Sequence, residues 1–174
     1  MPAKLEFEAW VSFPLERVFL FFANPNNLAR IMPPASGARI DRVKLVPPPP
    51  APSSHTPNPN LAGVGTEIFT SFKVLPLLHF RATWITFVTE FEWNQHFADI
   101  QTKGPFRRWQ HCHEFATEIR HGISGTLVRD VIEYDAGFGF LGTVAEKFFV
   151  SAQMGRTFAY RQQILGSVLS DTSS

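Results

Sequence analysis

Two histidines separated by one residue, His111 and His113, are the side chains of this sequence best suited to chemistry. An imidazole has an unperturbed pKa of about 6.5, so near neutral pH it can transfer a proton or bind a metal. Residues two apart in a strand point to the same face, so both rings would enter the same space. Asp99 or Asp130 could orient an imidazole, and Tyr134 could donate to a carbonyl. The set fits acid–base catalysis, with His111, His113 and Asp130 as catalytic candidates.

Metal binding is a second use of the same pair, with Asp99 or Asp130 as a third ligand. Zinc and iron normally need three protein ligands. The two carboxylates also have a simpler use as hydrogen-bond partners of histidine or tryptophan. We therefore expect no metal and no other cofactor.

The histidines belong to a predicted β-hairpin whose strands cover residues 92–101 and 106–119, with a turn at Gly104-Pro105. Side chains of one face alternate between large aromatic groups and groups that form hydrogen bonds, which suits the wall of an enclosed cavity. That face carries Phe97, Asp99, Gln101, Trp109, His111, His113 and Phe115. The single cysteine, Cys112, falls on the opposite face, where we expect a buried and unreactive thiol.

Further strands are predicted by alternation and helices by a 3.6-residue apolar period. In the long helix, Phe158 and Leu165 belong to the apolar stripe, and Arg161 is expected on another face. Gly155 is expected to allow close packing of this helix on the sheet. By residue number, the strands are 5–13, 38–46, 66–74, 79–89 and 126–135, the short helices 14–23 and 26–32, and the long helix 143–169.

Composition narrows the function classes. The chain has 174 residues and a net charge of +1, so we expect one domain, residues 1–174, and no nucleic-acid partner. Its 18 Phe and 4 Trp against 2 Tyr favour an apolar interior. One cysteine cannot form an internal disulfide. The first residues lack a basic segment followed by an apolar run, so we expect no signal peptide, and the sequence has no run of about 20 apolar residues. We expect a cytoplasmic protein without a membrane span, as a monomer or weak homodimer.

Residues 47–62 hold half of the 14 prolines and few large apolar side chains. Such a segment cannot pack as core, so we expect an exposed loop between neighbouring strands. A proline-rich ligand for an aromatic groove is the alternative. His55 within the loop is expected to be solvated.

Together, these elements resemble the START-related superfamily of helix-grip proteins, also called SRPBCC. The hairpin motif is similar to that of the bacterial cyclase/dehydrase-like branch, and it reads Phe97-x-Asp99-x-Gln101-x-x-Gly104-Pro105-Phe106-x-x-Trp109-x-His111-x-His113-x-Phe115. Residues 13–28 and the motif Gly125-Thr126-x-x-x-Asp130-x-Ile132-x-Tyr134 extend the likeness over essentially the whole chain.

The resemblance implies an α+β helix-grip fold. In that fold a curved antiparallel sheet of about six or seven strands wraps around a long C-terminal helix, and two short helices follow the first strand. A cavity lies between sheet and helix. The superfamily includes lipid and hormone binders, polyketide cyclases and ring-hydroxylating oxygenase domains, so the fold does not settle the function. The oxygenase alternative needs an iron site, for which no convincing ligand spacing exists outside the hairpin.

We therefore expect the chain to bind or carry a small to medium hydrophobic ligand in the internal cavity. A polyketide cyclase or dehydratase using His/Asp acid–base chemistry is the alternative, and an interaction module with a filled cavity is a third possibility. The expected ligand-binding residues are Trp84, Phe97, Asp99, Gln101, Trp109, His111, His113, Phe115, Asp130, Tyr134 and Phe158.

Overall fold

A computed structural model describes residues 2–52, 59–73, 81–135, 137 and 139–171 of the chain. Within them, seven strands form one antiparallel sheet in the spatial order β1-β7-β6-β5-β4-β3-β2. Strands β2 to β7 are a meander, and β1, the first strand of the sequence, pairs with the last strand, β7. The strands are β1 (Ala3–Val11), β2 (Arg39–Lys44), β3 (Glu67–Lys73), β4 (Arg81–Glu92), β5 (His96–Lys103), β6 (Arg108–Arg120) and β7 (Ile123–Asp135).

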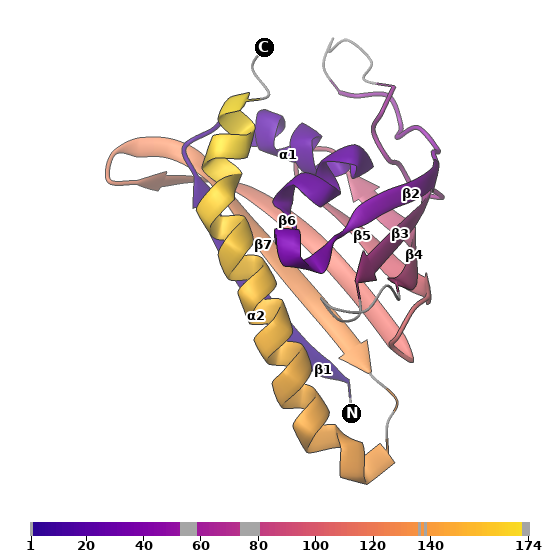
Figure 1. Cartoon of the computed structure of the whole chain (residues 1–174). Helices are drawn as coiled ribbons and strands as arrows, with labels where there is room; N and C mark the ends of the chain where they lie inside the picture. Colours follow the sequence, from indigo (N-terminus) through magenta and orange to yellow (C-terminus); the bar gives the residue numbers. More distant parts are fainter. Residues whose placement is uncertain (1, 53–58, 74–80, 136, 138, 172–174) are drawn as a thin grey trace.

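The long helix α2 (Gly139–Asp171) runs across the sheet beside β1, and the short helices lie near its C-terminal end (Figure 1). This is the curved sheet, long C-terminal helix and pair of short helical segments that the sequence predicts. Among the described residues, no helix is both long and apolar enough to cross a membrane.

The segment after β1 begins with helix α1 (Leu15–Ala23), which follows Pro14 and buries Val18 and Phe19. The second predicted helix is instead a 3₁₀ helix, η1 (Pro25–Ile31), followed by a single 3₁₀ turn, η2 (Pro34–Ser36). The side chain of Asn24 accepts a hydrogen bond from the backbone N–H of Asn26, at 3.1 Å, and so caps η1. Pro25 and Pro34 each stand at the first position of their segment, where the missing N–H of proline leaves no helical hydrogen bond unmade.

The strand boundaries differ from the prediction at two turns. Strand β4 continues to Glu92, and the turn before β5 contains Asn94 with a positive φ of 59°. Strand β7 starts at Ile123, because the turn is the pair His121-Gly122, whose φ values are 51° and 78°. Two consecutive residues with positive φ suit a tight hairpin turn. The predicted start of the fourth strand, with His79, lies outside the described residues.

Gly125, which directly precedes the predicted strand 126–135, lies inside β7 and beside the end of β1. A Cβ at this position would come within 2.6 Å of the Trp10 ring and would also meet the carbonyl of Val11. The glycine therefore allows the close approach of β1 and β7. Gly155 differs, because a Cβ at this position would meet nothing within 4 Å. The prediction that Gly155 allows the long helix to pack closely on the sheet is therefore wrong.

The proline-rich segment leaves β2 with Pro47, Pro49 and Pro50 exposed. Its last residues are buried instead, since Leu61 is 3% and Ala62 7% exposed. The backbone N–H of Ala62 donates to the carbonyl of Ala23 at 2.9 Å, which ties the end of the loop to α1. The expected exposure of residues 47–62 therefore does not extend to their C-terminal end. Residues 53–58, with His55, lie outside the described part.

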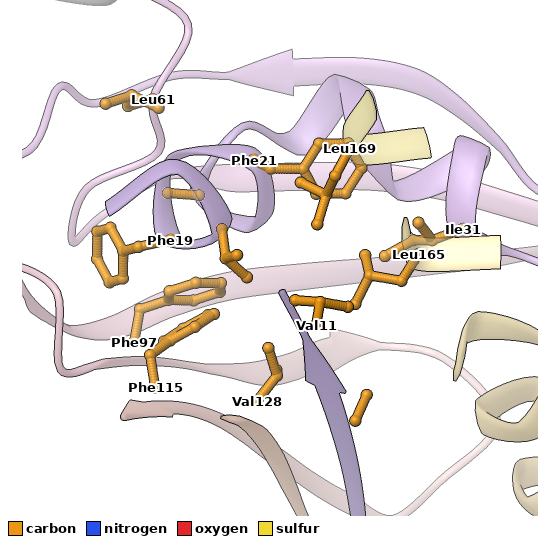
Figure 2. Packing of buried hydrophobic residues seen from close by; sticks show 13 residues of the cluster. Val11, Phe19, Phe21, Ile31, Leu61, Phe97, Phe115, Val128, Leu165 and Leu169 are labelled. Atoms are coloured by element: carbon orange, nitrogen blue, oxygen red, sulfur yellow. The ribbon is translucent and has the colours of Figure 1, made fainter. Parts of the chain in front are cut away.

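The buried apolar residues form two clusters. The larger has thirteen members and joins α1, the sheet and the end of α2 (Figure 2). In it, Phe97 and Phe115 lie below Phe19, while Leu165 of α2 lies near Ile31 and Leu169 near Phe21. The smaller cluster contains Trp109, Ile132, Tyr134, Val150 and Phe158.

Candidate functional site

The hairpin of β5 and β6 turns its histidine-bearing face inward. Asp99 pairs with His111, and Phe97 with His113, so all four side chains share one face. The side chains of His111 and His113 are 12% and 11% exposed. Two imidazoles are thus held in the apolar interior by strand alternation alone.

Asp130 of β7 is the centre of the polar group inside the fold. It is 2% exposed and pairs with His113 across the two strands. His111 Nε2 lies 2.8 Å from Asp130 Oδ1 in hydrogen-bond geometry. His113 Nδ1 lies 2.7 Å from the same oxygen, but without the direction of a hydrogen bond. One carboxylate oxygen therefore faces both rings.

Arg161 of α2 completes this group from the opposite side. Its Nη1 donates to both oxygens of Asp130, at 3.1 and 3.2 Å, and the residue is 4% exposed. The expectation that Arg161 lies on another face of the helix is therefore wrong. A signal was present, because Arg161 follows Phe158 by three residues and precedes Leu165 by four, which places all three on one helical face.

Burial and charge set the protonation of these groups. Burial alone would raise the pKa of Asp130, but Arg161 and the two histidines hold it well below its usual value. Burial, together with the charge of neighbouring His111, lowers the pKa of His113 to about 4, although Asp130 acts in the opposite direction. Desolvation raises the pKa of Asp99 to about 6. Near neutral pH the site therefore combines an ionised Asp130 with a neutral His113.

A group of aromatic side chains lies beside these polar residues. The rings of Trp84 and Trp109 meet edge to face at 4.9 Å, and Phe106 stacks on Trp109 at the same distance. Phe106 also meets Tyr134 at 5.5 Å. Phe158 of α2 stacks on Phe7 of β1 at 4.1 Å, which fixes the helix over the sheet.

Tyr134 contributes the polar atom of this aromatic group. The residue is 3% exposed, and its hydroxyl has no hydrogen-bond partner within the described part of the chain. A buried hydroxyl without a partner costs free energy, so it marks a place where a ligand or a water would be accepted.

Three residues that the sequence predicts as ligand contacts have partners within the protein: Phe97, Phe115 and Gln101. Phe97 and Phe115 pack against Phe19, at 6.0 and 5.2 Å, and belong to the larger core cluster. The side-chain amide of Gln101 donates to the carbonyl of Phe106 at 2.6 Å. Gln101 therefore closes the hairpin turn from the side of β5.

Cys112 faces away from the histidines, as the alternation predicts. Burial raises the pKa of its thiol to about 11, aided by the charge of Glu114, so the thiolate is disfavoured. On this outer face a shallow hollow of about 390 Å³ is lined by Glu90, Gln95, His96, Cys112, Glu114 and Phe115. His96 lies 3.4 Å from Glu90 and 3.7 Å from Glu92 there.

The chain matches no protein-family model. A search of curated proteins also finds no match. Solved structures do match: the protein TTHA0849 from Thermus thermophilus aligns with a TM-score of 0.64 at 14% identity, over 99% of this chain and 100% of that one. A point mutant of norcoclaurine synthase from Thalictrum flavum, in complex with a transition state analogue, aligns with a TM-score of 0.58 at 10% identity. That alignment covers 100% of this chain and 98% of the synthase.

The protein Ara h 8.0201 aligns with a TM-score of 0.57 at 10% identity, over 94% of this chain and 97% of that one. Identities this low support only a common fold. The alignments nevertheless extend over nearly the full length of all three proteins, sheet and long helix together. The seven-stranded curved sheet, the short helices after β1 and the C-terminal α2 thus give this chain the helix-grip fold.

Proposed function

We propose that the chain binds or carries a small to medium hydrophobic molecule between α2 and the inner face of the sheet. The observation that carries this proposal is the Tyr134 hydroxyl, which is buried among aromatic rings and has no partner within the described residues. A ligand with a hydrogen-bonding group beside its rings or acyl chain would satisfy that hydroxyl.

The aromatic side chains supply the apolar part of the proposed contact. Trp84, Phe106 and Trp109 form a continuous set of rings on the inner face, and Phe158 closes it from α2. A ligand that buries on the order of 300 Å² of apolar surface would gain several kcal/mol before entropic costs. Because the cost of association is subtracted from this gain, we expect binding no tighter than micromolar.

The polar part of the contact comes from the group around Asp130. Arg161 occupies both oxygens of Asp130, and His111 approaches one of them, so this carboxylate is already satisfied. Beyond it, the imidazoles and the carboxyl of Asp99 offer donors and acceptors toward the interior. We expect these groups to select ligands that carry a hydroxyl, carbonyl or carboxyl.

The proposal is tested by native mass spectrometry of freshly purified protein, followed by denaturing extraction of any bound compound. A titration with the fluorescent apolar probe 1-anilinonaphthalene-8-sulfonate gives a second measure. Trp84→Leu should weaken probe binding at least tenfold. Trp10→Leu is the matched control, because Trp10 lies on the opposite side of the sheet from the buried Ala9 and Val11. Equal affinities for the two variants, with no retained compound, would refute an interior ligand site.

Acid–base catalysis is the second candidate, and the His111–Asp130 hydrogen bond of 2.8 Å favours it. A carboxylate that orients an imidazole is the arrangement of a general base. In norcoclaurine synthase this fold accommodates a transition state analogue. The cyclase or dehydratase alternative predicts that polyketide-type substrates turn over with a bell-shaped pH profile. His111→Ala would abolish that turnover, whereas a carrier would show none.

The remaining expectations concern the whole protein. A cytoplasmic location and a monomer or weak homodimer stay predictions. Sedimentation velocity over a hundredfold range of concentration would measure the oligomeric state, and a sedimentation coefficient that rises with concentration would indicate the dimer.

A further inference from the structure

Three potential metal ligands meet at the inner face of the hairpin. Asp99, His111 and His113 each offer one ligand atom, and these atoms lie within 4.8 Å of one another. The strand register explains the meeting, because Asp99 lies directly opposite His111 and His113 follows two residues later on the same face. Three atoms at such separations can be brought onto one ion by small side-chain rotations.

Asp130 leaves one nitrogen of each imidazole available to an ion. It faces Nε2 of His111 and Nδ1 of His113, so the other nitrogens, Nδ1 of His111 and Nε2 of His113, remain for a ligand bond. Metal-binding histidines almost always direct their second nitrogen to a carboxylate or carbonyl, which fixes the tautomer and the ring orientation. A single buried carboxylate would do this for both rings.

Charge balance distinguishes the two carboxylates. Arg161 contacts both oxygens of Asp130 and offsets its charge. Within the described ranges, the carboxylate of Asp99 has no hydrogen bond and no ion pair of its own. Asp99 is therefore the carboxylate suited to ligate a cation, and Asp130 the one suited to orient the histidines.

We propose that Asp99, His111 and His113 form a binding site for one divalent first-row transition metal ion, with Asp130 as the carboxylate that orients both imidazoles. Two nitrogen ligands and one oxygen ligand suit zinc, cobalt(II) and iron(II), and do not suit calcium or magnesium. Three protein ligands leave at least one coordination position open, as in catalytic rather than structural zinc sites. An open position could accept water or the polar end of a bound molecule.

The proposal revises the sequence-based expectation of no metal, and it does not depend on the hydrophobic ligand. The hairpin pattern contained the two histidines and Asp99, and the next predicted strand contained Asp130, but alternation could not say which carboxylate would reach the histidines. The structure separates the roles through Arg161, whose position on α2 the sequence analysis misjudged.

The test uses the full chain after treatment with a chelator. Isothermal titration with zinc chloride should give one site per chain with micromolar or tighter affinity, and magnesium chloride should give none. Cobalt(II) should produce visible absorption bands of a low-symmetry site. Asp99→Asn and His113→Ala should each weaken zinc binding at least tenfold, and Asp130→Asn about 10- to 100-fold. Circular dichroism confirms that each variant is folded.

His96→Ala is the matched control, because His96 also lies beside two carboxylates, Glu90 and Glu92, on the outer face. It should leave zinc affinity unchanged. Zinc binding that disappears in His96→Ala but persists in His113→Ala would overturn the proposal. So would the absence of zinc binding to the folded wild-type chain. Either result leaves the titration with the apolar probe interpretable, so the two proposals fail separately.

Discussion

Asp130 connects three parts of the molecule through one side chain. Its carboxylate meets Arg161 of α2 and both histidines of β6 while almost completely buried. A buried carboxylate is costly unless it is paired and hydrogen-bonded, so each of its partners has a structural effect as well as a chemical one. This dependence can be measured one partner at a time.

Removing the partner on α2 should destabilise the fold strongly. Arg161→Met retains the apolar stem of the side chain but leaves the charge of Asp130 without its guanidinium. We expect a loss of about 3 to 5 kcal/mol in the free energy of unfolding, the usual effect of breaking a buried pair from one side. Urea denaturation monitored by circular dichroism measures it.

Arg156→Met provides the control on the same helix. Arg156 is exposed, and within the described part of the chain its side chain donates a hydrogen bond to Gln153 alone. It should change the free energy of unfolding by less than about 0.5 kcal/mol. The double variant Arg161→Met/Asp130→Asn should recover part of the loss, since no buried charge remains unpaired. Equal effects of the two arginine substitutions would contradict the importance of this pair.

The pH dependence of stability separates Asp99 from His113. His113 has a folded-state pKa of about 4, below its unperturbed value of 6.5. Between these values the unfolded state binds the extra proton, so the contribution of His113 to the free energy of unfolding increases as pH rises. Asp99 has a folded-state pKa of about 6, above its ordinary value of 3.8. Between these values the folded state binds the extra proton, so the contribution of Asp99 to the free energy of unfolding decreases as pH rises. The two effects oppose each other between about pH 4 and 6.

Substitution should therefore reveal slopes of opposite sign. Relative to the wild type, Asp99→Asn should gain stability as pH rises from about 4 to 6, by at most about 1.4 kcal/mol per pH unit. His113→Gln should lose stability over the same range. Chelator-treated protein and urea titrations at half-unit pH intervals provide the comparison. Parallel pH profiles for the two variants would show that neither group titrates as assigned.

At the scale of elements, the sequence predicted the sheet and helices well and the polar partners less well. Alternation in the hairpin correctly placed His111 and His113 together, because a strand period of two leaves one choice of face once the aromatic residues are buried. The burial of Arg161 was not predicted, because its charge was taken as a sign of exposure. Its spacing from Phe158 and Leu165 nevertheless places it on the same helical face as these two apolar residues. The sequence analysis did not predict the contact that Gln101 makes with the turn. Its side-chain amide donates to the carbonyl of Phe106, and alternation does not show such a local hydrogen bond.

Two glycines show why residue type alone was insufficient. Gly125 lies where a Cβ would meet the backbone and the Trp10 ring of β1, whereas Gly155 on α2 has open space. Gly125→Ala should thus destabilise the protein by about 1 to 3 kcal/mol through overpacking. Gly155→Ala should stabilise it by up to about 1 kcal/mol, because alanine favours the helix.

Thermal and urea denaturation of both glycine variants test this pair. The same chemical change, one added methyl group, should therefore give shifts of opposite sign. A loss of stability in Gly155→Ala would mean that the helix at this point packs more closely than the described contacts indicate. Tolerance of Gly125→Ala would show that β1 can move away from β7 at little cost.

At the scale of the whole molecule, α2 is anchored unevenly. Its C-terminal half contributes Leu165 and Leu169 to the larger cluster, in which thirteen buried residues join the helix to α1 and the sheet (Figure 2). Its middle contributes Val150 and Phe158 to the smaller cluster of five. Local stability follows the buried apolar contacts of a segment, so the two parts of one helix should open with different free energies.

Hydrogen exchange should reveal this difference and link it to ligand binding. In the ligand-free protein, amides of residues 161–169 should exchange more slowly than those of residues 150–158. A saturating apolar probe should slow residues 150–158 most, because the proposed contact lies beside Phe158 and the aromatic rings of the sheet. Protection that increases equally along α2 would indicate general stiffening instead, and protection confined to the outer face near His96 would move the ligand to the hollow on that side.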